Sequence, residues 1–418
     1  MQIYIDARPP YAFEKIFGMT LLERILRQLF ELGITRGVTV ILEPNMPLDG
    51  FIRKDFWPRY QIQYDEIYME APLLRLVDGE NGTDQSLMLL EGDGIYDERV
   101  LRRLLLSTNS LYIHAGEDKD VPIAVIVQAD DRKHLNSAIC HIGEFLKKQV
   151  GNGWLETLSI YDMDQYIPEL RQTAVPSLIK LQDRSSIRAI ENEMYEKTFK
   201  GVIDFIAAYV YRIPVRGLVR LLAPTRITPN LVTAISVICS LAAIPLFAMG
   251  WLGTGLAVAF VFVIADSLDG KLARMTVRFS KVADKVDHFT SPAFETCYYL
   301  AWGWYFSGGD FSTLPGKAAV LLCCFFVLDR IVTSVFGCKY GRSLLDYNKC
   351  DARFHLIAAR RNINLFIMTL GLVFQKPIGA LYIITLWMFT TMLWHIYRFV
   401  VHVSRKSISS IHTVEKYS

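Results

Sequence analysis

The sequence predicts an N-terminal α/β domain of the Rossmann-like type, followed by an all-α polytopic membrane domain with six transmembrane helices. Three observations lead to this fold class. In the first part of the chain, short β-rich apolar runs alternate with stretches of helical period. After residue 226 the apolar segments reach about 20 residues, the length that crosses the hydrocarbon core of a bilayer. Basic residues gather in alternate connections between those segments, as they do in membrane proteins.

The composition excludes several classes of protein. The chain has 418 residues, of which 52% are hydrophobic and 21% charged, so it is neither disordered nor collagen-like. This length is typical of two or three domains. The formal net charge is only +3, which gives no electrostatic reason to expect a nucleic-acid partner. The seven cysteines contain no CxxC pair, and the first residues, MQIYIDA, lack the pattern of a secretory signal, so we expect a reducing, cytosol-facing setting.

Residues 1–184 are expected to form the α/β domain, in the cytoplasm. The β-rich runs occupy six ranges: 2–5, 38–42, 86–90, 111–113, 123–127 and 158–161. Apolar residues follow a helical spacing between them, as in 21–32 and 99–106. Strands that alternate with helices indicate βαβ units in one sheet. None of these runs is long enough to span a bilayer.

Residues 185–226 differ in composition from both neighbouring regions. They mix Lys, Arg and Glu with large apolar residues at helical spacing, as in YEKTFKGVIDFIAAYVYRIPVRGLVRLL. Helices of this kind lie in the headgroup plane with their apolar face in the membrane, so we expect juxtamembrane amphipathic helices here. An ordinary helix between two domains is the alternative interpretation.

Six apolar segments are expected in the membrane domain, residues 227–402. They occupy 227–249, 251–273, 286–306, 317–336, 363–374 with an extension on its N-terminal side, and 378–401. Basic residues lie between the second and third segments, between the fourth and fifth, and near the end of the sixth, which predicts that both termini are cytoplasmic. We therefore expect a multi-pass protein of the cell inner (cytoplasmic) membrane, with membrane lipids as partners and a cytoplasmic tail at 403–418.

Carboxylates stand at the cytosolic end of the second segment. Asp266 and Asp269 are three residues apart and so share one helix face, and Asp287 stands at the start of the third segment. Carboxylates near a bilayer are costly and usually face a polar cavity or bind cations. Oxygen ligands favour Mg²⁺, Mn²⁺ or Ca²⁺ over zinc. The alternative is that these acids pair with nearby Arg and Lys side chains.

The string from residue 266 to residue 291 resembles the signature of the CDP-alcohol phosphotransferase family, D-x2-D-G-x2-A-R-x8-G-x3-D-x3-D. The matching residues are Asp266, Asp269, Gly270, Ala273, Arg274 and Asp287. Thr228-Pro229-Asn230 is similar to the TPN sequence at the start of the family's first span, and the resemblance extends over about residues 198–402. Six spans is the usual number in that family.

The resemblance implies an activity, the transfer of a substituted phosphate from a CDP-alcohol donor to an acceptor hydroxyl with release of CMP, in phospholipid or related polar-lipid synthesis. The acceptor is either a lipid or a polyol phosphate. In the family the aspartates hold two divalent cations on the diphosphate, so the implied ligands of Mg²⁺ or Mn²⁺ are Asp266, Asp269 and Asp287. The implied substrate-binding residues in this region are Asn230, Gly270, Ala273, Arg274 and Ala283. A homodimer is an arrangement that the resemblance allows.

Two positions depart from the signature. Ala283 stands where the family has glycine, and Ser291 stands where it has its fourth aspartate, which is also the proposed base. A serine neither binds a second cation well nor acts as a strong base. The nearby substitutes are Asp284, His288 and Glu295. We expect the catalytic base among Asp287, His288 and Asp284. A one-metal enzyme, an alternative base and a catalytically weakened relative all stay open.

A basic strip lies between the fourth and fifth segments. It consists of Arg353, His355, Arg360 and Arg361. An anionic acceptor or a lipid headgroup would suit this strip, so Arg360 and Arg361 join the expected substrate-binding residues. The alternative is that these charges contact lipid phosphate without specificity.

The first part of the chain resembles a second family, the sugar-phosphate nucleotidyltransferases. Residues 15–34 are similar to the segment after their nucleotide loop, and residues 87–105 are similar to their strand ending in Gly-Asp, whose aspartate binds a divalent metal and would be Asp93 here. The glycine-rich loop is missing, and Pro9 and Pro10 remove backbone donors from the same place. We therefore expect a degenerate nucleotidyltransferase-like domain, in a layout similar to that of bifunctional inositol-phosphate cytidylyltransferase/CDP-inositol phosphotransferases.

Three hypotheses follow for the function. The first is a divalent-metal-dependent CDP-alcohol phosphotransferase. The second is a catalytically weakened or non-catalytic membrane protein that binds nucleotide or lipid through an inherited site. The third is a bifunctional enzyme that also makes the CDP-alcohol, which requires an active Asp93.

Overall fold

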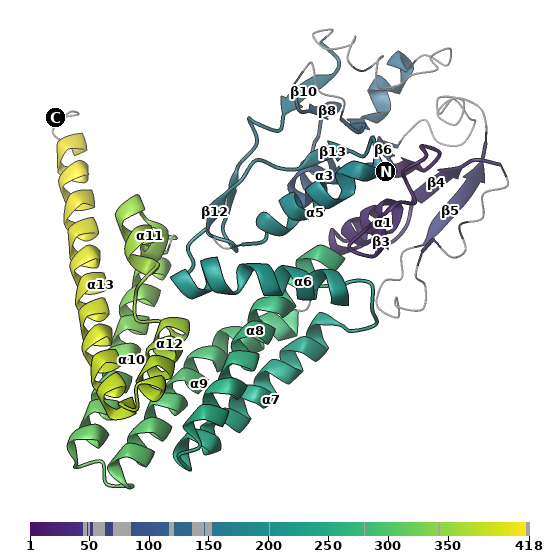
Figure 1. The fold of residues 1–418 in the computed structure, drawn as a ribbon. Helices are drawn as coiled ribbons and strands as arrows, with labels where there is room; N and C mark the ends of the chain where they lie inside the picture. Colours follow the sequence, from purple (N-terminus) through teal and green to yellow (C-terminus); the bar gives the residue numbers. More distant parts are fainter. Residues whose placement is uncertain are drawn as a thin grey trace.

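The computed structural model places a sheet domain on one end of a bundle of long helices (Figure 1). It describes residues 1–44, 48, 51–52, 63–69, 85–116, 121–135, 146, 153–199, 201–279, 281–341 and 343–414. Within these ranges, the side chains of 281–291, 346 and 405–414 are outside the description. The N-terminus lies in the sheet domain, and the C-terminus follows the last long helix of the bundle (Figure 1).

A seven-stranded sheet forms the centre of the N-terminal domain, with strand order β10-β8-β9-β6-β1-β4-β5. Its strands are β1 Gln2–Asp6, β4 Val38–Leu42, β5 Tyr64–Tyr68, β6 Leu87–Glu91, β8 Leu111–His114, β9 Ala124–Val127 and β10 Glu156–Ser159. Neighbouring strands are parallel except where β9 pairs with β6 and β8. This arrangement confirms the predicted α/β domain, although β10 begins two residues earlier than expected.

Short helices and hairpins complete the sheet domain. Helix α1 (Leu21–Glu31) begins at Thr20, whose side chain accepts from the Glu23 backbone, and α3 (Glu98–Leu105) begins at Asp97 in the same way. The remaining strands form pairs: β2 Lys15–Ile16 with β3 Met19–Thr20, β7 Gly94–Tyr96 with β13 Leu178–Lys180, and β11 Tyr166–Ile167 with β12 Gln172–Thr173. Two 3₁₀ turns, η2 Ala129–His134 and η3 Arg184–Ser186, join these elements.

Three helical segments connect the sheet domain to the bundle: α5 (Ile187–Glu196), a π-helical turn η4 (Ile206–Val210) and α6 (Arg212–Leu222). Helix α6 runs between the two parts of the molecule (Figure 1), and it packs against α8 of the bundle. Its arginines pair with α5, as in the 3.1 Å ion pair of Arg220 with Glu191. Ile213 and Leu221 of α6 are 67% and 65% exposed, so an apolar face stays open. The headgroup-plane position stays a prediction.

The bundle contains α7 Pro229–Ala248, α8 Leu252–Thr276, α9 Lys281–Ser307, α10 Leu314–Tyr340, α11 Lys349–His355, α12 Arg361–Val373 and α13 Pro377–Val414, with a 3₁₀ turn η5 at Leu344–Asp346. Helix α7 starts with Thr228 as its cap and Pro229 at its first position, where the missing N–H has no cost. The turn between α7 and α8 passes through Gly250 at φ 82°.

Four described helices are long and apolar enough to cross a membrane: Pro229–Ala248, Leu252–Thr276, Leu314–Tyr340 and Pro377–Ser404. The six predicted spans are therefore not confirmed. The third predicted span falls on α9, which begins among residues whose side chains are outside the description. The fifth falls on α12, which begins at Arg361, two residues before the predicted start at Ile363, and its 13 residues measure about 20 Å at 1.5 Å per residue.

The sheet domain and the bundle share one hydrophobic cluster. It contains Ile16, Phe17 and Leu21 from the sheet domain together with Leu272 and Met275 from the end of α8. A common apolar core makes the contact between the two parts a packed one, and it places the sheet domain against the cytosolic end that we predicted for α8.

Candidate functional site

Helix α8 carries the two carboxylates that the sequence singled out. The Asp269 side chain is held in place by hydrogen bonds from the Thr233 hydroxyl of α7, at 2.6 Å, and from the Gly270 backbone, at 2.6 Å. Asp266, one turn earlier, forms an ion pair with Arg361 at the start of α12. The Arg361 guanidinium also lies 4.4 Å from the centre of the Phe262 ring. The expected pairing of acids with basic side chains is thus found for Asp266.

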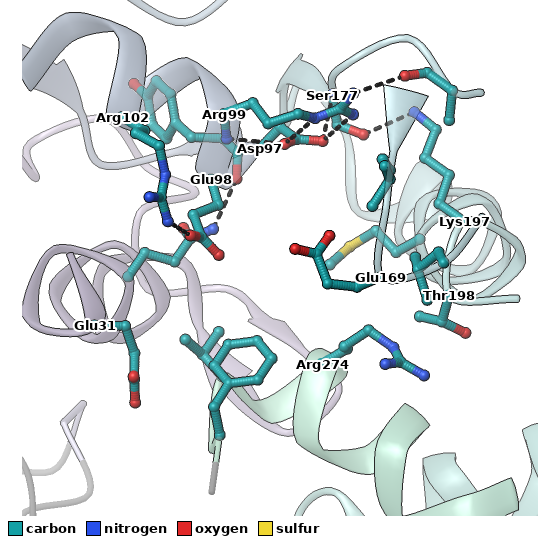
Figure 2. Close-up of a pocket in the computed structure, with 18 of the residues that line it drawn as sticks. Glu31, Asp97, Glu98, Arg99, Arg102, Glu169, Ser177, Lys197, Thr198 and Arg274 are labelled. Atoms are coloured by element: carbon teal, nitrogen blue, oxygen red, sulfur yellow. Dashed lines mark hydrogen bonds and ion pairs between the residues drawn. The ribbon is translucent and has the colours of Figure 1, made fainter. Parts of the chain in front are cut away.

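A cavity of about 1090 Å³ lies between the bundle and the sheet domain. The residues on the bundle side of this cavity include Asn230, Asp269, Gly270, Ala273 and Arg274, which the sequence predicted for the site. Thr233 and the residues at the end of α8 and just after it, Met275, Val277, Arg278 and Phe279, line it as well and were not predicted. Figure 2 shows Arg274 on the bundle side and Glu169 on the sheet-domain side of the cavity. The structure therefore brings these five predicted residues together around one space, whereas Asp266, a predicted cation ligand, is not among the lining residues.

The sheet-domain wall of the cavity is held together by its own ion pairs. Asp97 pairs with Arg99, at 2.9 Å, and Glu98 pairs with Arg102, at 2.5 Å (Figure 2). Lys197 donates to the Ser177 hydroxyl at 2.7 Å. The wall is therefore a polar surface whose charged side chains pair with one another.

Part of the predicted site lies outside the described side chains. The backbone of α9 passes through Ala283, Asp284, Asp287, His288 and Ser291, but the positions of these side chains are not described. Their roles stay predictions. Glu295, one of the substitutes for the missing aspartate, is only 8% exposed and accepts a hydrogen bond from the Tyr299 hydroxyl at 2.5 Å.

The basic strip separates into side chains with different surroundings. Arg353 is exposed, whereas His355 is 3% exposed and its Nδ1 atom has no hydrogen-bond partner. Buried nitrogen atoms without a hydrogen-bond partner also occur on Arg360 and on Arg330 of α10. Buried polar atoms normally have partners, so this group has capacity to bind an anion. Arg360 and Arg361 therefore do not act as one surface, because Arg361 is engaged with Asp266.

Sequence reasoning missed three polar groups in the bundle. Thr233 holds Asp269, and Asp329 pairs with His395 of α13 at 2.5 Å. Arg330, like Arg360, has buried nitrogens without a hydrogen bond, and its guanidinium forms a 3.6 Å ion pair with Asp329. A signal was present in the sequence, since Asp329 and Arg330 interrupt an apolar helix of 27 residues. Ionisable residues inside such helices are functional candidates by default.

The acids of the sheet domain have different surroundings. Asp6 pairs with Arg8 at 2.8 Å, and Glu91 pairs with Lys180 at 3.1 Å. Asp93 is 2% exposed, and its burial, followed by the negative charge of Glu91, raises the pKa of its carboxyl to about 7. Asp93 is thus a buried acid beside carboxylates that already have cationic partners.

The donor set at α8 has the chemistry that Mg²⁺ or Mn²⁺ requires. Asp266 and Asp269 provide carboxylate oxygens on successive turns of one helix, and both cations prefer such ligands. In the part of the chain that the structure describes, no group of three or more Asp, Glu, His or Cys side chains is arranged as a metal site. A complete set at α8 depends on Asp287, whose side chain is outside the description.

Comparison with known proteins agrees with the signature. Residues 226–396, less than half of the chain, match the family model described as CDP-alcohol phosphatidyltransferase, which confirms the resemblance found in the sequence. The phosphatidylinositol phosphate synthase of Mycobacterium tuberculosis with CDP-DAG bound is 18% identical, with a TM-score of 0.35, over 46% of this chain and 93% of that chain. The same enzyme in complex with manganese and citrate is 18% identical, with a TM-score of 0.36, over 46% and 88%.

A different solved structure is similar to the chain as well. A protein described as a glucose-1-phosphate thymidylyltransferase, from Bacillus anthracis, is 10% identical, with a TM-score of 0.31, over 46% of this chain and 94% of that chain. No curated protein shows a significant match to this chain.

Proposed function

We propose, from the premise that residues 226–396 form a CDP-alcohol phosphatidyltransferase domain, that this chain is a membrane transferase which moves a substituted phosphate from a CDP-alcohol to an acceptor hydroxyl and releases CMP. One observation carries the proposal. Asn230, Asp269, Gly270, Ala273 and Arg274, all singled out by the sequence, line one cavity of about 1090 Å³. Ligand cavities are usually about 300–1,000 Å³, so this volume suits a nucleotide-linked donor.

The donor diphosphate would lie against α8. Arg274 offers a planar guanidinium, which suits phosphate oxygens. A Cβ atom on Gly270 would lie 3.3 Å from Arg274 Nη2, so a side chain at this position would crowd the guanidinium. Glycine at 270 therefore leaves Arg274 room to face the cavity.

Asp266, Asp269 and Asp287 would hold Mg²⁺ or Mn²⁺. A bound cation supplies charge compensation for the diphosphate and for the CMP that leaves. Thr233 keeps the Asp269 carboxylate in one orientation through its 2.6 Å hydrogen bond. Asp266 would exchange its ion pair with Arg361 for the cation, which would leave the Arg361 guanidinium beside the substrate.

The acceptor would approach from the opposite end of the site. Arg360 and Arg330 carry buried nitrogens without hydrogen-bond partners. The phosphate oxygens of an anionic acceptor substrate, either a lipid or a polyol phosphate, would accept hydrogen bonds from these nitrogens. The base that takes the hydroxyl proton would be Asp287, His288 or Asp284, in place of the aspartate that Ser291 replaces. The site would face the cytoplasm, with both termini on that side of the inner membrane and with a homodimer as one assembly.

Release of CMP tests the proposal. The full chain in lipid nanodiscs is supplied with Mg²⁺ or Mn²⁺ and a panel of CDP-alcohols, including CDP-diacylglycerol, together with lipid and polyol-phosphate acceptors. We expect CMP release that Asp269→Ala reduces by at least about 100-fold, because the reaction loses a cation ligand. Asp310→Ala is the matched control, since Asp310 lies in the turn between α9 and α10 and bonds only within that turn. No CMP release with any donor, or equal release by both variants, would contradict the proposal.

A second candidate is a weakened or non-catalytic protein that binds nucleotide or lipid. It is motivated by the neutral Ser291 and by the ion pair that engages Asp266. A bifunctional enzyme would also consume CTP and release pyrophosphate in a reaction that depends on Asp93. The pairing of Asp6 with Arg8 and of Glu91 with Lys180 argues against that activity, because these acids already have cationic partners.

A further inference from the structure

Two arginines of the sheet domain cap the end of the helix that carries the site. Arg24 Nη1 donates to the Met275 carbonyl at 2.7 Å, and Arg27 Nη1 donates to the Thr276 carbonyl at 2.7 Å. Both side chains are buried, with residue exposures of 8% for Arg24 and 0% for Arg27. Both arginines belong to α1, and both carbonyls belong to the last two residues of α8.

The end of α8 needs such partners. The last four carbonyls of a helix accept no hydrogen bond from within the helix, and the helix dipole makes this end negative. Helix α8 stops abruptly, because Val277 has φ 49°, a left-handed conformation that a β-branched residue rarely adopts. Arg278 N bonds back to the Ala273 carbonyl. The carbonyls of Met275 and Thr276 accept hydrogen bonds from the guanidinium groups of Arg24 and Arg27.

Contacts with the rest of the chain hold Arg27, helix α1 and the loop before α1 in place. Glu23 pairs with Arg27 along α1, and Gln28 donates to the Tyr96 carbonyl at 2.8 Å. Just before α1, Phe17 N donates to Glu191 of α5 at 3.0 Å. Gly18 approaches Pro224 so closely that a Cβ would lie 2.6 Å from its Cα.

Buried guanidinium groups are an expensive way to join two domains. Each loses its hydration, so an apolar contact of the same size would dock the domains at lower cost. The two arginines instead constrain geometry, because both hydrogen bonds can form only when the last turn of α8 lies in one position and one rotation relative to α1. That turn follows directly on Ala273 and Arg274, and Arg24 and Gln28 line the same cavity as Asp269 and Arg274.

We propose that Arg24 and Arg27 are positioning residues for the phosphotransfer site: the sheet domain holds the last turn of α8 so that Asp269 and Arg274 face the cavity. The proposal rests on the proposed function for its effect on activity. It gives the degenerate first half of the chain a role that requires no nucleotidyl transfer. The sheet domain becomes part of the transferase through two hydrogen bonds to backbone carbonyls.

The test uses the full chain with Arg24→Met, Arg27→Met and Arg24→Lys, and with Arg36→Met as the matched control. Arg36 is exposed in the loop after α1 and has no part in the site. Methionine keeps much of the packing and removes the donors, whereas lysine keeps one donor. Hydrogen exchange of the amides in residues 270–278 is measured beside CMP release at varied Mg²⁺ concentration.

We expect both methionine variants to exchange faster at 270–278, and to show at least a 10-fold lower kcat and a several-fold higher half-saturating Mg²⁺ concentration. Arg24→Lys should recover part of each change, and Arg36→Met should match the parent chain. A variant with lower thermal stability but unchanged exchange and Mg²⁺ dependence would overturn the proposal. If one methionine variant fails to insert, the other decides the same comparison.

The two proposals fail in different ways. A parent chain without CMP release contradicts the transferase, and the exchange measurement still reports on the cap. A parent chain that releases CMP, with methionine variants that release it at the same rate and exchange at the same rate, overturns the positioning role and leaves the transferase intact.

Discussion

Two groups of carboxylates in this chain lie where the sequence resembles the metal site of a known family, and their surroundings differ. At the carboxyl ends of β1 and β6, Asp6 and Glu91 have cationic partners from the same domain, and Asp93 is 2% exposed. On α8, Asp269 faces a cavity of about 1090 Å³ beside Arg274. The two groups therefore differ in their access to a ligand-sized space, as well as in the elements that carry them.

The comparison also points to a structural contribution of the sheet domain. Its acids Asp6 and Glu91 form ion pairs with Arg8 and Lys180. A domain in that condition can still contribute through its surface. Arg24 and Arg27, on the helix that follows the altered loop, contact the backbone of the second site.

The largest expected difference in CMP release is between substitutions of the basic side chains that pair with each group of carboxylates. Arg361→Gln should reduce CMP release by about 100-fold, because it removes the guanidinium that would lie beside the substrate phosphates once Asp266 binds the cation. Lys180→Gln should change CMP release by less than about twofold, since its partner Glu91 lies in the sheet domain. Steady-state CMP assays of both variants check this. Similar losses in both would remove the distinction between the two groups.

A gain is expected from restoring the missing acid on α9. Ser291→Asp should raise turnover by about 10-fold if the site is weakened only by the lost carboxylate, because an aspartate is both a cation ligand and a base. Ser312→Asp, in the turn between α9 and α10, is the control. An unchanged rate in Ser291→Asp would favour the non-catalytic hypothesis.

A smaller effect is expected at Thr233. Thr233→Val removes the 2.6 Å hydrogen bond to Asp269, and a typical hydrogen bond contributes about 1 kcal/mol, which is about a fivefold change in an equilibrium constant. The half-saturating Mg²⁺ concentration should therefore rise by about fivefold, measured as the cation dependence of CMP release. Thr233→Ser keeps the hydroxyl and should restore most of the loss. Equal behaviour of the valine and serine variants would show that the hydroxyl has no such role.

The smallest effect on activity is expected at Asp93, where stability should change instead. Burial raises the pKa of Asp93 from 3.8 to about 7, so between these values the folded chain holds a proton that the unfolded chain releases. Stability of the sheet domain should therefore fall as pH rises from about 4 to about 7. Thermal unfolding followed by domain-specific hydrogen exchange measures this, and Asp93→Asn should flatten the dependence. A stability that rises over this range in the parent chain contradicts the assignment.

The sequence predicted the elements whose signals are local. Residues 38–42 form a strand because they are β-rich and bounded by polar turns, and the predicted apolar run 86–90 falls on β6, Leu87–Glu91. Asp269, Gly270, Ala273 and Arg274 of α8 line one cavity because a helical period places residues three to five apart near one face. The signature identified Asp269 and Arg274 before any geometry was known. These successes depend on residues close together in the chain.

The rest depends on contacts that sequence spacing does not encode. Arg24 and Met275 are separated by 251 positions, and nothing in either segment indicates that they meet. Thr233 reaches Asp269 from a neighbouring helix, across 36 positions. The partner of Asp266 was not predicted either, because Arg361 reaches it from the start of α12, across 95 positions.

The most direct test of the central claim sets one acid from each group side by side. CMP release is measured for the parent chain, Asp269→Asn and Asp93→Asn under the same cation and donor conditions. We predict a loss of at least about 100-fold for Asp269→Asn and a change of less than about threefold for Asp93→Asn. A retained rate in Asp269→Asn, or a comparable loss in Asp93→Asn, would contradict the account.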